Sequence, residues 1–177
     1  LKTCCIKGLL RPQEFQHHII CLLSLFYKDS EEHLAEQARF IDFVTNKDFY
    51  SELAARATGS LTRKEAKQQS FILFFAQNRT AARQPFYRVF KELFPILANE
   101  ISLIKESDYK KVAFEMQSGE SRIMITGALL DLARLEIPAF SIHDSILCLP
   151  EHLEIVQGCI SRNFVKQTGF APVLKTE

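Results

Sequence analysis

The chain has 177 residues, of which 47% are hydrophobic and 24% charged, enough for one globular domain with a hydrophobic core or for a core with a smaller lobe. Its formal net charge of +1 excludes nucleic-acid binding through an overall positive field, so such binding would need a local basic face. The longest apolar run, IICLLSLFY at 19–27, is too short to span a bilayer, and we expect neither a membrane segment nor a secretory signal.

The cysteines indicate the redox environment. They stand at positions 4, 5, 21, 148 and 159, with no CxxC or Cys/His ligand spacing. Their odd number and apolar neighbours favour reduced, partly buried thiols. We therefore expect an intracellular, cytoplasmic protein in a reducing compartment. The chain begins with Leu1 and not with Met, so we expect a piece of a longer protein.

Most of the chain is expected to be helical, because apolar residues recur every three or four positions. The segments with this spacing are 14–28, 31–57, 62–76, 81–105 and 117–135. Thr62 and Glu65 have the spacing of a capping box, which predicts that a long helix begins near Arg63.

Strand pairing is expected near the C-terminus. The β-prone runs IPAFSI and SILCLP flank His143 and Asp144 and predict an antiparallel hairpin. A helix over about 151–167 and an edge strand within 171–177 follow. The expected fold class is α+β, predominantly helical, with a small antiparallel β-hairpin or sheet.

One face of the helix that begins near Arg63 changes from cationic to aromatic side chains along its length. Arg63, Lys67, Phe71 and Phe75 recur every four residues, so they line one face. A guanidinium and an ammonium suit phosphate groups, and aromatic rings suit a base or a sugar. This order predicts a face for a nucleoside triphosphate. The alternative is packing, with the phenylalanines in the core and the two cations in solvated first turns.

The order of segments resembles that of family A DNA polymerases and the related phage-type single-subunit RNA polymerases. RKEAKQQSFILFFA is similar to the fingers helix of the family, TNKDFYSELAARATG to the segment before it, and FYRVFKELFPIL to the aromatic helix after it. FEMQSGESRIMITGALL is similar to the palm helix, and SIHDSI to the palm hairpin. The tight spacing resembles compact phage, plasmid or integrated-element enzymes.

The resemblance implies a role for each matching residue. Arg63 and Lys67 would bind the phosphates of the incoming nucleotide, with Phe71 and Phe75 against its sugar and base. Asp144 would bind the catalytic Mg²⁺. Gln117 would touch the minor groove of the primer-template. Apart from the resemblance, His143 could pack on or hydrogen-bond to the primer end, and Arg79 and Arg83, beyond the fingers-like helix, could meet a template phosphate.

Two of these assignments have an alternative, that of Asp144 and that of Arg79 and Arg83. Asp144 could instead form a polar hairpin turn by bonding its own backbone, and Arg79 and Arg83 could merely solvate a loop. The resemblance also implies a single polymerase-like unit over 1–177, with fingers-like helices at approximately 45–105 and palm-like parts at 1–44 and 106–177.

The sequence departs from the family at the metal site. No Asp occurs from residue 1 to 27, Arg11 stands where the first metal-binding Asp would align, and Glu14 is the one acid in that stretch. Ser145, Phe75 and Ala76 replace the usual Glu, Tyr and Gly of the DNA enzymes. A segment upstream of Leu1 or a partner chain could supply the second carboxylate.

Three functions follow from these observations. The first is template-directed nucleotidyl transfer of the DNA polymerase type, with a DNA primer-template, a nucleoside triphosphate and Mg²⁺. The second is a catalytically inactive, polymerase-derived module that binds nucleic acid or nucleotide. The third is a plain helical interaction domain, which would place Phe71 and Phe75 in the core.

Overall fold

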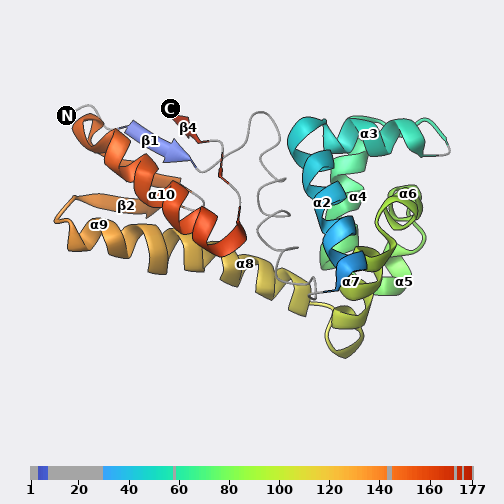
Figure 1. Cartoon of the computed structure of the whole chain (residues 1–177). Helices are drawn as coiled ribbons and strands as arrows, with labels where there is room; N and C mark the ends of the chain where they lie inside the picture. The colour runs from blue at the N-terminus through green and yellow to red at the C-terminus, as the bar shows by residue number, and fades with distance from the viewer. Residues whose placement is uncertain are drawn as a thin grey trace. The chain divides into compact units, whose positions relative to one another are not determined.

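The computed structural model describes residues 4–7, 30–57, 59–142, 145–169, 171–172 and 174–176. It divides into two compact units, and the boundary falls within helix α8 (Lys111–Ile123), between Glu115 and Met116. One unit contains the helices from α2 to α7, and the other contains a small sheet with its covering helices (Figure 1). The predicted class, α+β and predominantly helical, is confirmed.

The helical unit begins its described part at Ser30. Its elements are α2 (Glu31–Asn46), α3 (Phe49–Arg56), α4 (Arg63–Phe75), α5 (Asn78–Ala81), α6 (Pro85–Leu93) and α7 (Pro95–Ser107). The predicted start of α4 is confirmed: Thr62 Oγ1 accepts from the Glu65 amide at 3.3 Å, and Glu65 Oε2 accepts from the Thr62 amide at 2.8 Å. This capping box satisfies two amides at the first turn.

Two predicted helices are each broken into shorter ones. The helix expected over 31–57 is interrupted at Lys47, which is extended, and Asp48 then caps α3 by accepting from the Ser51 amide at 3.2 Å. The helix expected over 81–105 is interrupted at Pro85 and Pro95, which begin α6 and α7. Proline has no amide hydrogen to donate, so it favours the first turn of a helix over its interior.

The proline-started helices are capped by side chains from other helices. Gln69 of α4 accepts from the Phe86 amide at 3.0 Å, at the start of α6. The two carboxylate oxygens of Glu36, on α2, accept from the amides of Ile96 and Leu97 at 3.1 and 2.8 Å, at the start of α7. These bonds satisfy amides that have no partner within their own helix.

Aromatic rings fill the core of the helical unit. Phe40 of α2 meets Phe94 edge to face, with ring centroids 4.9 Å apart, and Phe86 stacks on Phe90 with centroids 6.2 Å apart. Phe49 joins the cluster from α3 and meets Phe86 at 6.1 Å. Such edge and offset contacts add to the burial of apolar area. The cluster holds α2, α3 and α6 together.

The second unit is built on a four-stranded antiparallel sheet. Its strands are β1 (Cys4–Lys7), β2 (Ala139–Ile142), β3 (Ser145–Cys148) and β4 (Lys175–Thr176), in the order β2-β3-β1-β4. The predicted hairpin is confirmed, with Ile142 paired to Ser145, and so is the C-terminal edge strand. Strand β1 was not predicted, because its four residues carry no alternation long enough to indicate a strand.

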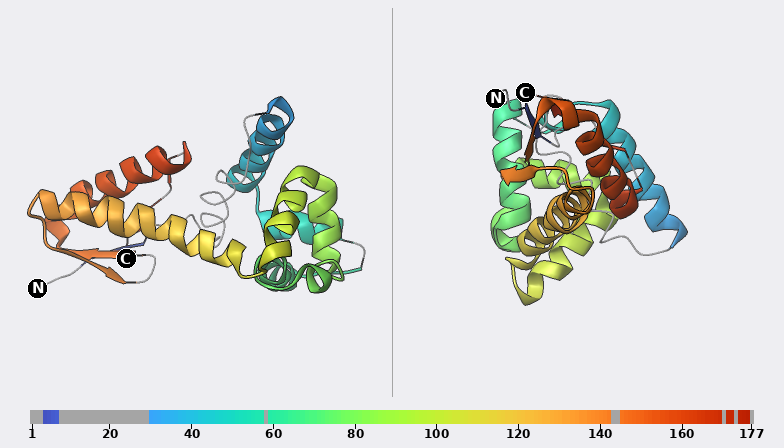
Figure 2. Two further views of the ribbon diagram at one scale, coloured as in Figure 1. Left: turned by 90° about the horizontal axis from the view of Figure 1, so that it is seen from below. Right: turned by 90° about the vertical axis from the view of Figure 1, so that its left-hand side faces the viewer.

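Helices cover this sheet (Figures 1 and 2). The π-helix η1 (Met124–Leu129) contacts β2 and β3, and α10 (Leu153–Thr168) packs on η1, β1 and β3. The C-terminal part of α8 leads into η1, α9 (Leu130–Arg134) follows it, and the short 3₁₀ turn η2 (Pro150–His152) precedes α10. The helix expected over 117–135 is confirmed, although it begins earlier, at Lys111. The helix predicted over about 151–167 corresponds to α10.

The π-helix meets α10 at a glycine. A Cβ at Gly127 would lie 2.6 Å from Oδ1 of Asn163, whose amide nitrogen donates to Asp131 at 2.8 Å and to the Cys159 carbonyl at 2.9 Å. Gly127 therefore permits a close approach between the two helices. The helix predicted over 14–28 lies outside the described residues. Among the helices that are described, none is long and apolar enough to cross a membrane.

Candidate functional site

The face of α4 that carries the predicted nucleotide contacts lies beside its buried stripe. The buried residues of α4 are Ala66, Ser70, Leu73 and Phe74. Phe71 keeps 38% of its surface exposed, and Phe75 is half-buried, with its ring centroid 5.7 Å from that of Phe71. Phe74 therefore packs in the core, and the ring of Phe71 lies at the surface, where a flat group can reach it.

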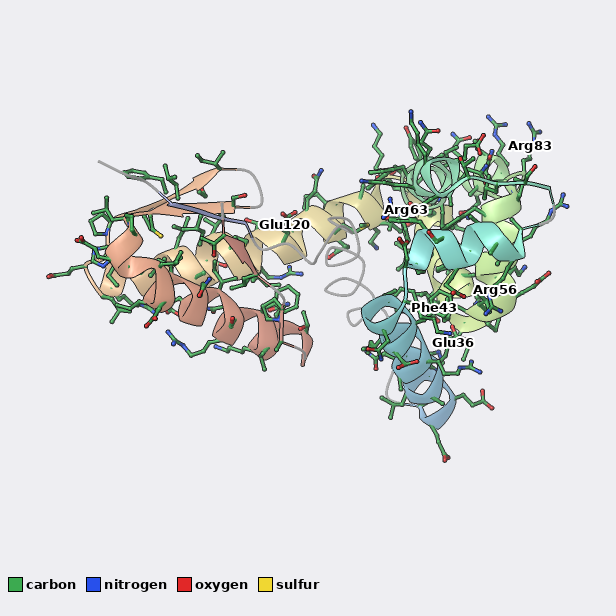
Figure 3. All side chains as sticks on the ribbon, turned by 90° about the horizontal axis from the view of Figure 1, so that it is seen from above. Glu36, Phe43, Arg56, Arg63, Arg83 and Glu120 are labelled. Carbon is green, nitrogen blue, oxygen red and sulfur yellow. The ribbon has the colours of Figure 1, made fainter. Side chains whose placement is uncertain are left out.

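Arg63 is held at the start of this face by an acid and a ring. Its Nε donates to Oδ2 of Asp48 at 2.8 Å, and its guanidinium carbon lies 5.6 Å from the centre of the Tyr50 ring. Both partners come from the short segment that begins α3. Figure 3 shows Arg63 at the first turn of α4. The bond to Asp48 fixes the direction of the planar guanidinium, as a fork that grips phosphate requires.

Tyr50 lies beneath Arg63 and is fully buried. Its hydroxyl has no hydrogen-bond partner among the described residues, and the neighbouring Ser70 hydroxyl donates to the Lys67 carbonyl at 2.7 Å. Burial raises the pKa of the Tyr50 phenol above its ordinary value. Tyr50 is therefore a neutral ring at physiological pH, and it provides a flat surface against the guanidinium.

Lys67 and the first turn of α4 make a positive region. Lys67 is half-buried and forms no ion pair with any residue that the structure describes. The N-terminal end of a helix carries a partial positive charge from its unpaired amides. A cation without an acidic partner near such an end is suited to a phosphate.

The remaining predicted contacts lie on other elements. Arg79 on α5 and Arg83 in the turn after it are exposed, as Figure 3 shows for Arg83. Gln117 is exposed on α8 and belongs to the unit that carries the sheet.

The predicted metal site falls outside the described residues. His143 and Asp144, which follow β2 and precede β3 in the chain, are not among the described residues. Arg11 and Glu14 are not among them either. Within the ranges that the structure describes, no group of three His, Cys, Asp or Glu side chains could hold a metal ion. The described residues therefore do not by themselves form a magnesium site.

Asp48 and Tyr50, which position Arg63, were not predicted from the sequence. Both belong to TNKDFYSELAARATG, the segment that resembles the family just before its fingers helix. An available signal was the position of Asp48 before an apolar run with Ser51 three residues later, which is typical of a helix N-cap. The pairing with Arg63, 15 residues further on, depends on the turn between α3 and α4.

Comparisons with known proteins show the fold. No protein-family model matches the chain, and no curated protein matches its sequence. Among solved structures, the chain is similar to the POL domain of Pol1 from M. smegmatis, solved in complex with a DNA primer-template and dNTP. The TM-score is 0.62 at 9% sequence identity, and the match covers 99% of this chain and 39% of that one. The chain therefore has the fold of part of a bacterial DNA polymerase domain and spans well under half of that structure.

Proposed function

We propose that the chain takes part in template-directed nucleotidyl transfer of the family A DNA polymerase type, and that α4 binds the incoming nucleoside triphosphate. One observation carries the proposal: Arg63, Lys67, Phe71 and Phe75 share an accessible face of α4 in a chain with a polymerase-domain fold. The packing alternative has less support, because it requires Phe71 in the core, whereas 38% of the surface of Phe71 is exposed.

The order of charge along α4 supports binding in one direction. Residues four apart on a helix are separated by about 6 Å along its axis, so the face changes from cationic to aromatic within a few turns. The helix N-terminus, Arg63 and Lys67 all favour the triphosphate at the first two turns. The rings of Phe71 and Phe75 then lie where a sugar and a base would extend.

The other residues of the proposal concern the nucleic acid and the metal. Arg79 and Arg83 would hold a template phosphate, Gln117 the minor groove of a DNA primer-template, and His143 the primer end. Asp144 would be a ligand of Mg²⁺, which supplies Lewis-acid stabilisation of the transferring phosphoryl group. The roles of Gln117 and Asp144 rest on the resemblance of their sequence segments to the family, and those of Arg79, Arg83 and His143 rest on their positions in or beside such segments.

A second function is favoured by one sequence observation. Two-metal phosphoryl transfer needs more than one carboxylate, yet residues 1–27 contain no Asp, and Arg11 stands at the family position of the first one. A polymerase-like chain whose metal site has a single carboxylate would bind nucleotide or nucleic acid without turnover. The alternative is therefore a catalytically inactive, polymerase-derived binding module.

Triphosphate binding and primer extension separate these functions. We expect Arg63→Gln and Lys67→Gln each to weaken binding of a fluorescent dNTP about tenfold, the effect of one charge-assisted hydrogen bond. Lys64→Gln is the matched control, because Lys64 is exposed on the same helix but lies off this face. Equal affinity in all three variants would refute the role of the face.

Extension of a primer-template with Mg²⁺ tests turnover. If the chain is a polymerase, Asp144→Asn abolishes extension while dNTP binding persists. If the wild-type chain binds dNTP and extends no primer, the inactive module is the correct function. If it neither binds nor extends, both functions fail.

A further inference from the structure

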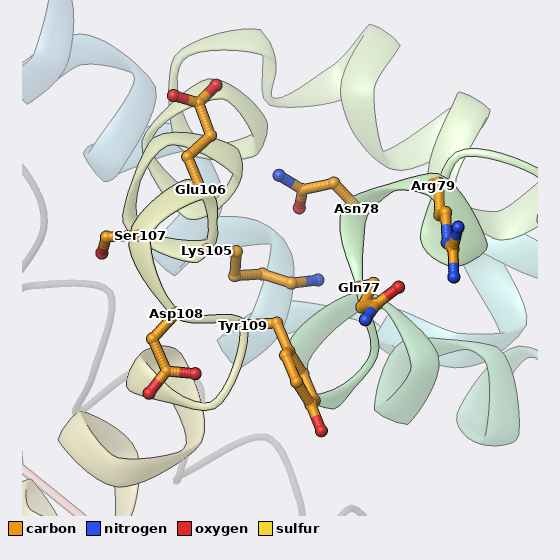
Figure 4. Close-up of a pocket in the computed structure, with 8 residues that line it drawn as sticks. All are labelled: Gln77, Asn78, Arg79, Lys105, Glu106, Ser107, Asp108 and Tyr109. Carbon is orange, nitrogen blue, oxygen red and sulfur yellow. The ribbon is translucent and has the colours of Figure 1, made fainter.

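A pocket of about 460 Å³ lies in the helical unit, next to the C-terminal end of α4 (Figure 4). It is formed by the start of α5, the end of α7 and the turn that follows α7. Its polar lining includes Gln77, Asn78, Arg79, Lys105 and Tyr109. Gln77 and Arg79 are exposed, so a group from solvent can reach them.

Lys105 is the unusual residue of this pocket. It is only 4% exposed, and its Nζ donates to the carbonyl of Leu73, in the last turn of α4, at 2.7 Å. An ammonium has three hydrogens to donate, and this carbonyl is its one hydrogen-bond partner among the described residues. A buried cation with no counter-ion is costly.

The acids of the pocket do not neutralise Lys105. Glu106 and Asp108 form no ion pair with it, and in Figure 4 their carboxylates point away from its ammonium. Asp108 instead accepts from the Lys110 amide at 2.9 Å. The Lys105 ammonium points toward Gln77 and Asn78, and Asn78 donates its side-chain amide to the Ser102 carbonyl at 2.8 Å.

Two cations in one pocket lack acidic partners. Arg79, like Lys105, makes no ion pair within the described part of the chain. The amide of Gln77 adds a neutral donor to the lining. A tetrahedral anion with several acceptor oxygens would complete the bonds of such a set.

We propose that this pocket binds a phosphate group, with Lys105 and Arg79 as its cationic residues. The inference extends the proposed function, since Arg79 is one of its nucleic-acid-binding residues, and it adds Lys105 as the buried anchor. The phosphate can come from a nucleic acid strand or from a free nucleotide, and the chemistry of recognition is the same. Burial lowers the pKa of Lys105 from 10.5 to about 8, as expected of an ammonium that lacks an anion.

The decisive measurement is the titration of Lys105 in the wild-type chain. We expect ¹⁵N NMR of its Nζ to show a rise in pKa when oligothymidylate or inorganic pyrophosphate is added, because an anion favours the charged form. A response to oligothymidylate alone identifies strand phosphate as the ligand, and a response to both includes free nucleotides. A pKa unchanged at saturating concentrations of both probes would refute the proposal and leave Lys105 as a cap of α4.

Variants give an independent readout. Lys105→Met and Arg79→Gln should each weaken oligothymidylate binding about tenfold and lower the slope of log K against log salt by about 0.7, the value for one phosphate contact on a single strand. Lys91→Gln, an exposed lysine on α6, is the control and should change neither quantity. Because Arg79 is exposed, its variant remains informative even where Lys105→Met unfolds, and unchanged affinity and slope in Arg79→Gln would count against the site.

The same variants separate this inference from the proposed function. Arg63→Gln should weaken dNTP binding and leave the Lys105 response to pyrophosphate unchanged. If Arg63→Gln has no effect while the Lys105 response persists, the proposed triphosphate face fails and the phosphate pocket stands.

Discussion

Replacing Lys105 with methionine should change the pH dependence of stability in one direction. The variant keeps an apolar stem of similar length and removes the buried ammonium. In the folded chain, burial lowers the pKa of Lys105 from 10.5 to about 8. Below pH 8 the amine is charged in both states, so the folded state carries the full cost of desolvation.

The magnitude follows from the two pKa values. Between pH 8 and 10.5 the unfolded chain binds a proton that the folded chain has lost, so this residue makes the free energy of unfolding rise with pH. At about 1.4 kcal/mol per pH unit, the contribution over that window totals about 3 kcal/mol. The lost bond to the Leu73 carbonyl adds a cost to the variant of about 1–3 kcal/mol where the amine is charged.

Urea unfolding of both proteins at several pH values, in buffers free of phosphate, checks this prediction. The difference in free energy of unfolding, wild type minus Lys105→Met, should increase from pH 8 to 10.5, and other titrating groups cancel in it. A difference that stays constant across this range would show that the folded state does not perturb Lys105.

Three further variants test the packing around the site, each by urea unfolding. Tyr50→Phe removes a buried hydroxyl without a partner among the described residues, so the free energy of unfolding at pH 7 should stay equal or rise by about 1 kcal/mol, and a decrease at pH 7 would contradict this expectation. Because folding raises the pKa of the Tyr50 phenol, the variant should also lose less stability than the wild type above pH 10. Glu36→Gln should cost about 1–3 kcal/mol, since it removes the charge that accepts two amides of α7, whereas the exposed Glu32→Gln should cost almost nothing. Gly127→Ala should cost about 1–3 kcal/mol, because its Cβ would lie 2.6 Å from Oδ1 of Asn163. The control is Gly158→Ala, where the nearest atom is 3.5 Å away, and equal stability of the two variants would contradict the close approach at Gly127.

Local patterns in the sequence predicted the elements that depend on nearby residues. The start of α4 follows from the capping box of Thr62 and Glu65, and the hairpin follows from two β-prone runs of similar length. The breaks at Pro85 and Pro95 were available from the sequence as well. They were missed because the apolar spacing continues across them, and each proline begins a new helix whose apolar face joins the same core.

Pairings between distant elements could not be predicted in the same way. Strand β1 is short, and its place in the sheet follows from pairing with β3 and β4, which come from the other end of the chain. The spacing of Arg63, Lys67, Phe71 and Phe75 predicted that they share a face. It did not predict which phenylalanine the core would take, because that depends on where α6 packs against α4.

The position of the α4 face depends on residues that do not belong to it. At its first turn, Asp48 caps α3 and binds Arg63, which ties the two helices together. At its last turn, Lys105 of α7 binds the Leu73 carbonyl, and Glu36 of α2 binds the amides at the start of α7. A change at Glu36 would therefore reach α4 through α7. Glu36→Gln should weaken dNTP binding only as far as it loosens α7, and the loss should be smaller than that of Arg63→Gln, which removes a phosphate contact directly.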